Sequence, residues 1–187
     1  FDLYPHNYPR RVLVSNFEHP VTRGIDAGTV YGNTLPFGPI LLPVDGDGTE
    51  LGAAWISRGN PYQIGLAIKE FGRGAAGSGA AGPRGAGDYA AVFTAALQLP
   101  ADLWRGLARY AGAHVYLEEN DVLMAAARVV GVHSLKSGPR RLYLPGPCRV
   151  QDLIADRLYA ECTRQIEWEL CAPETALFGL TPAGSTR

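Results

Sequence analysis

A glycine-rich stretch holds the first residues whose types and spacing could do chemistry. Residues 72–77 read GRGAAG and match the GxGxxG pattern, in which glycines let backbone N–H groups approach a pyrophosphate. In a dinucleotide site this pattern opens a helix, but here residues 78–83 continue as SGAAGP. Residues 72–87 are too rich in glycine for the interior of a helix or strand. We therefore predict a long surface loop, and we expect no cofactor.

Four charged side chains lie in or beside this loop and are the candidate ligand-binding residues. They are Glu70, Arg73, Arg84 and Asp88. Long loops that follow the strands of an open α/β sheet often bind ligands. If the chain is an enzyme, we expect its site here, acting on an anionic or sugar ligand.

Hydrolytic or nucleophilic chemistry would need a pair of acidic side chains or an activated nucleophile. Glu118, Glu119 and Asp121 cluster between two predicted strands, which favours a solvated turn over the acid/base pair of a glycosidase. No GxSxG or GxCxG elbow is present to position a nucleophile. The sequence therefore contains no complete catalytic set that we can name.

The histidines and cysteines favour structural roles over metal binding. The histidines lack HxH or HxxxH spacing, which favours hydrogen-bonded structural residues: His6, His19, His114 and His133. The cysteines are odd in number and form no CxxC pair: Cys148, Cys162 and Cys171. We expect small buried thiols in a reducing, cytoplasmic compartment rather than disulfides or a zinc site.

Composition limits the class of protein. The 187 residues are 47% hydrophobic and 19% charged, which suits one large domain or two small ones. The net charge of -1 lacks the basic excess of a nucleic-acid-binding protein. No apolar run is long enough to cross a bilayer, so we expect neither a nucleic acid nor a membrane as partner. The chain begins with Phe1 and shows no signal-peptide pattern, which is compatible with a processed mature protein or a piece of a longer protein, and we favour the piece.

Periodicity and turn residues predict two unlike halves. Short strands are expected at 11–14, 40–44, 50–56 and 63–71, with a Gly- and Pro-rich loop at 32–39. Residues 101–111 show helical spacing of apolar residues, with Pro100 and Asp102 at the start and Gly112 at the end. Later, strand-like runs alternate with turns, among them residues 137–139, 145–147 and 172–173. This spacing predicts a small antiparallel sandwich over residues 113–187, after an α/β region over residues 1–112.

Several stretches, taken in order, resemble one protein family. Residues 18–24, EHPVTRG, are similar to the DHP-[IV]-T-R-G-L stretch of the glutamine-amidotransferase-like trimerisation domain in β-galactosidases of glycoside hydrolase family 42. Residues 103–116, LWRGLARYAGAHVY, resemble the signature at the end of that domain, and residues 121–125 resemble the strand after it. Residues 140–153 and 174–180 resemble its small C-terminal β domain.

The resemblance implies a fold and a role. It implies a partial amidotransferase-like, flavodoxin-like α/β sheet that lacks its first βα units, followed by a small β sandwich. In that family two glutamates of an upstream (β/α)₈ barrel carry out the reaction, while the amidotransferase-like domain helps build the oligomer. No catalytic residue can therefore be assigned in this chain.

The expected function follows from these implications. The chain would be a non-catalytic accessory and oligomerisation region of a glycoside-hydrolase-like protein. Its partners would be copies of itself, with a trimer as one option, or a companion catalytic chain, and a carbohydrate is a further ligand. The alternative is a small carbohydrate- or anion-binding enzyme with its site at residues 72–87.

Overall fold

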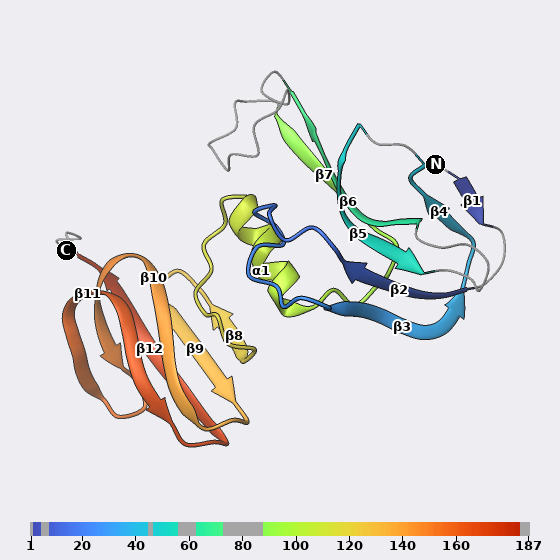
Figure 1. Cartoon of the computed structure of the whole chain (residues 1–187). Helices are drawn as coiled ribbons and strands as arrows, with labels where there is room; N and C mark the ends of the chain where they lie inside the picture. The colour runs from blue at the N-terminus through green and yellow to red at the C-terminus, as the bar shows by residue number, and fades with distance from the viewer. Residues whose placement is uncertain (1, 5–7, 45–46, 56–62, 73–87, 184–187) are drawn as a thin grey trace. The chain divides into compact units, whose positions relative to one another are not determined.

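The fold was obtained as a computed structural model that describes residues 2–4, 8–44, 47–55, 63–72 and 88–183. The chain divides into two compact units, Phe1–Ala113 and His114–Arg187, which are drawn from blue to green and from yellow to red in Figure 1. Each unit has its own hydrophobic core.

Antiparallel β-sheet makes up both units, so the predicted α/β class is wrong. A flavodoxin-like sheet needs parallel strands connected by helices. Here every strand pairing among the described residues is antiparallel, and one helix is found in the same residues. The physical reason is that only residues 101–110 combine helical periodicity with start and stop signals, whereas the other apolar runs are short and extended.

The first unit contains a five-stranded sheet and a two-stranded ribbon. The sheet has the order β3-β2-β5-β6-β7, and the ribbon pairs β1 with β4. Their bounds are Asp2–Tyr4 for β1, Tyr8–Val14 for β2, Val30–Phe37 for β3, Ile40–Leu42 for β4, Thr49–Trp55 for β5, Gln63–Phe71 for β6 and Tyr89–Thr94 for β7. The strands expected at 11–14, 40–44, 50–56 and 63–71 are thus confirmed, with shifts at their ends.

The predicted loop at 32–39 is wrong, because most of it belongs to β3. Gly32 has a φ of +106° and lies so close to the Arg10 carbonyl on β2 that an added Cβ would collide with it. A glycine inside a strand can mark such a close backbone approach instead of a loop. Composition alone does not distinguish the two cases.

Helix α1, Ala101–Tyr110, is confirmed where the sequence places it. It starts after Pro100 with Asp102 in its first turn, and Gly112 follows its end with a φ of +77°. The helix buries Leu103, Gly106 and Tyr110, and Leu103 and Tyr110 belong to the first core. It approaches the backbone at Val21 so closely that a Cβ on Gly106 would collide with the Val21 carbonyl oxygen. The EHPVTRG segment and α1 are therefore packed directly against each other.

The second unit is a single antiparallel sheet of order β11-β10-β12-β9-β8. The bounds are Val122–Ala125 for β8, Val129–Ser134 for β9, Gly138–Asp152 for β10, Arg157–Leu170 for β11 and Glu174–Pro182 for β12. The turn predicted at 145–147 is wrong: β10 runs through it, with a shift of register between Tyr143 and Cys148. The strands of the second unit therefore form one continuous sheet, whereas the predicted sandwich would have two separate sheets.

One glycine offers a test of the helix packing. Alanine normally stabilises a helix relative to glycine by about 1 kcal/mol. We expect Gly106→Ala to do the opposite and lower the free energy of unfolding by about 1–3 kcal/mol, because its Cβ meets a backbone carbonyl that cannot move aside alone. Denaturant unfolding followed by circular dichroism measures the change. The same substitution at Gly146, which has open space around it, is the control; equal effects at both positions would contradict the prediction.

Candidate functional site

The charged residues expected at the loop are only partly described. Arg73 and Arg84 lie outside the described residues. Glu70 lies near the end of β6 opposite Ala90 of β7, and Asp88 directly precedes β7. The Tyr110 hydroxyl donates a hydrogen bond to Glu70 Oε1, and Asp88 lies against the backbone of Gly72, whose φ is +122°. Glu70 thus has a structural contact with α1, and ligand binding by the four residues stays a prediction.

A histidine joins Glu70 and Tyr110 in one cluster. The His19 ring lies 5.3 Å from the Tyr110 ring, centre to centre, and its Nδ1 accepts a hydrogen bond of 3.2 Å from the Val21 amide. Burial lowers the pKa of His19, and the negative charge of Glu70 partly opposes this effect. Buried Thr22 donates from its hydroxyl to the Asn16 carbonyl at 2.5 Å. The EHPVTRG segment is therefore a hydrogen-bonded turn fixed to the helix.

The other histidines that are described make the expected hydrogen bonds. His114 Nε2 lies 2.9 Å from the Tyr143 carbonyl, and His133 Nδ1 lies 2.9 Å from the Thr175 hydroxyl. His6 lies outside the described residues. Within the described part of the chain, no group of three or more His, Cys, Asp or Glu side chains could hold a metal ion.

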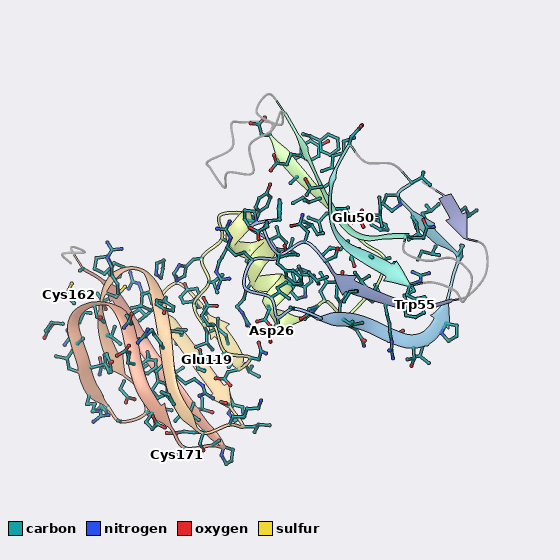
Figure 2. All side chains as sticks on the ribbon, viewed as in Figure 1. Asp26, Glu50, Trp55, Glu119, Cys162 and Cys171 are labelled. Carbon is teal, nitrogen blue, oxygen red and sulfur yellow. The ribbon has the colours of Figure 1, made fainter. Side chains whose placement is uncertain are left out.

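The cysteines are free, but only one is buried. Cys148 is buried, and that burial, together with the charge of Cys162, raises the pKa of its thiol. Cys162 within β11 and Cys171 just after it are both exposed (Figure 2). The expectation of three buried thiols is therefore wrong for two of them, because Cys162 lies at an outward position of a strand and Cys171 follows the end of that strand.

A groove on the second unit was not predicted. Its volume is about 520 Å³. The lining residues come from the segment before β8 and from β10 and β11: Glu118, Glu119, Pro139, Arg140, Arg141, Tyr143, Glu167, Trp168 and Glu169. Charged residues of both signs are thus brought to one surface from three separate segments.

Strand register sets a row of charges across this groove. Arg141 pairs in register with Glu167 on β11, and its Nε donates to Glu167 Oε1 at 2.6 Å. On the other side of β10, Leu117 pairs with Leu142, so antiparallel register places Glu118 opposite Arg141. The row therefore reads carboxylate, guanidinium, carboxylate. Hydrogen bonds with Tyr143 and Glu167 raise the pKa of Arg141.

A buried ion pair lies at one wall of the groove. Arg140 and Asp121 are bound to each other, and their side chains are only 7% and 6% exposed. Arg140 also donates to the Ser134 hydroxyl at 3.0 Å and to the Lys136 and Pro139 carbonyls at 2.8 and 3.1 Å. Burial alone would raise the pKa of Asp121, but hydrogen bonds and the charges of Arg140 and Lys136 outweigh it, and the pKa is lowered. The solvated turn expected at 118–121 is therefore wrong for Asp121.

Two buried polar atoms of the groove residues have no hydrogen-bond partner among the described residues. One is the acceptor Glu119 Oε2 and the other is the donor Trp168 Nε1. Glu119 lies in the segment that leads into β8 (Figure 2), and the Trp168 ring lies 5.3 Å from the Phe178 ring in the core. In the sequence, the alternation of apolar and acidic residues in 166–170, IEWEL, is the signal that could have pointed to this face.

Strand β8 forms one edge of the same sheet. Its four residues are apolar and all are exposed, with Val122 at 59% and Met124 at 63%. Within the described sheet, β8 pairs with β9 alone. Its outer backbone groups and both of its apolar faces are therefore available to another strand.

Comparison of this chain with known protein families, curated proteins and solved structures finds no match. No helix in the described residues has the length and apolar character needed to cross a membrane.

The buried ion pair can be tested by removing one charge. We expect Asp121→Asn to lower the free energy of unfolding by about 3–5 kcal/mol, because Arg140 is left as a buried charge without its counterion. The folded pKa of Asp121 is lowered, so its contribution is present above the unfolded pKa and is lost as the pH falls through the folded value. The difference between wild type and variant should therefore shrink below about pH 4.

Glu161→Gln is the matched control, since Glu161 and Arg149 form a pair that is 71% and 49% exposed. We expect it to change stability by less than about 1 kcal/mol. Denaturant titrations at several pH values give the loss in free energy of unfolding for each variant and its dependence on pH. Similar losses in the two variants, or a difference that does not depend on pH, would contradict the assignment.

Proposed function

We propose that this chain is a non-catalytic accessory and assembly region of a glycoside-hydrolase-like protein. The observation that carries the assembly role is the exposed apolar edge strand β8. The link to glycoside hydrolases rests on the ordered resemblance of residues 18–24, 103–116, 140–153 and 174–180. The α/β fold of the related domain is not part of the proposal.

The edge has no feature that would prevent pairing. Proteins usually protect edge strands with lysine, proline or a bulge. Strand β8 reads VLMA and has none of these, and Asp121 before it is neutralised by Arg140. Exposed apolar residues at an open edge support pairing with another chain.

A second copy of the chain is the partner that fits best. Two β8 strands can pair antiparallel about a two-fold axis, with Val122 opposite Ala125 and Leu123 opposite Met124 of the partner. Every cross-strand pair is then apolar, and no like charges meet. A homo-oligomer therefore needs no further surface to bury this strand.

We also place the protein in the reducing cytoplasm. Two exposed free thiols, Cys162 and Cys171, support this compartment, because exposed thiols tend to be oxidised elsewhere. Mass analysis of protein isolated under thiol-trapping conditions should find all three cysteines reduced.

Assembly is tested by mass measurement in solution. We expect the wild-type chain to self-associate and Met124→Lys to weaken association at least about tenfold, because a charge replaces an exposed apolar side chain that pairing would bury. Leu135→Lys is the control, since Leu135 is 77% exposed and follows β9 instead of lying on the edge. A wild-type monomer, or equal masses for the two variants, would contradict the proposal.

Catalysis is tested separately on the same chain. We expect no turnover of aryl β-galactosides by the wild-type protein, since the reaction is proposed to take place elsewhere in the parent protein. Turnover that survives repurification, and that is lost on a single substitution in this chain, would show that the non-catalytic role is wrong.

A further inference from the structure

We propose that the groove of the second unit binds a neutral, polyhydroxylated ligand of the carbohydrate class. The central group would be Arg141, with Glu118 and Glu167 on either side and the Tyr143 ring next to them. This site is built mainly on β10 and β11, with Glu118 from the segment before β8, and β11 and β8 are opposite ends of the strand order. The proposal therefore goes beyond assembly and does not depend on it.

The hydrogen-bonding pattern of the row fits hydroxyl groups. A carboxylate only accepts hydrogen bonds and a guanidinium only donates them, whereas a hydroxyl does both. Neighbouring strands lie about 4.7–4.9 Å apart, so acceptor and donor alternate over a short distance across the row. Adjacent hydroxyls of a sugar can donate to a carboxylate and accept from Arg141 at the same time.

The charges of the groove argue most strongly against an anion, and the central Arg141 argues against a cation at the middle of the row. An anion would meet the carboxylates of Glu118, Glu119, Glu167 and Glu169. A cation at the centre of the row would meet Arg141, and Glu167 Oε1 already accepts from Arg141 and from Gln165 Nε2 at 2.8 Å. The Arg140 charge is held by Asp121. A neutral ligand with many hydroxyls avoids both repulsions.

The size of the groove and its apolar surface are also suitable for a sugar ring. A volume of about 520 Å³ is in the range of small-molecule sites. Tyr143 is half-buried, its backbone amide donates to the Tyr116 carbonyl, and its backbone carbonyl is bound to His114. Its ring and Pro139 give the C–H face of a pyranose an apolar surface.

The test uses the full chain and ligands of matched size and different charge. Neutral methyl hexopyranosides are compared with D-glucosamine and D-glucuronate by saturation-transfer NMR and calorimetry. We expect at least one neutral pyranoside to bind with a Kd of about 1 mM or lower, and Arg141→Met to weaken that binding at least about tenfold. Methionine keeps the apolar stem of this 55%-exposed side chain, so the fold should be retained.

Arg149→Met is the matched control, because Arg149 also lies on β10 and pairs with a β11 carboxylate, Glu161, but does not line the groove. We expect its effect on binding to be less than about twofold, and Glu167→Gln to weaken binding as a second groove variant. The proposal is overturned if no neutral pyranoside binds, if a charged sugar binds more tightly, or if the two arginine variants behave alike. Met124→Lys should bind the ligand normally, which separates failure of this site from failure of assembly.

Discussion

The second unit depends on the pairing of one buried charge. The Arg140 side chain is buried, and burying a guanidinium without a counterion would cost too much free energy for the fold. Its donors bind Asp121 before β8, Ser134 at the end of β9, the Lys136 carbonyl in the turn that follows, and the Pro139 carbonyl at the start of β10. These segments can separate only by exposing that charge unpaired. The wall of the groove is therefore fixed by electrostatics as well as by packing.

The sheet of the second unit also depends on the length of strand β10. This strand pairs with β11 along both of its halves and with β12 along its second half only. Pro145 and Pro147 lie where the register shifts between Tyr143 and Cys148, so their missing N–H groups remove few ladder hydrogen bonds. The strand can therefore continue through them. Both halves contribute to one core, through Leu142 and Val150.

The sequence predicts elements better than it predicts their assembly. Helix α1 is found because periodicity, Pro100 and Gly112 all agree. The segments at 32–37 and 145–147 are missed because glycine and proline also occur in strands, at close approaches and register shifts. The α/β class failed because short apolar runs and one helix do not fix strand direction, and the pairings in the first sheet are all antiparallel. The groove is missed because Glu118, Arg141 and Glu167 are distant in sequence and meet only through strand register.

The two ends of the second sheet have different chemistry, and this difference connects the two proposals. Strand β8 is apolar and uncharged, whereas β10 and β11 present alternating acids and arginine. The β10 and β11 residues of the groove lie away from β8 in the strand order, so pairing through β8 would not use them and each copy in an oligomer would keep them. A site built mainly from exposed polar groups binds weakly by itself, because hydration competes with each hydrogen bond. Several copies on one polymeric sugar would bind far more tightly through effective concentration, without any new contact.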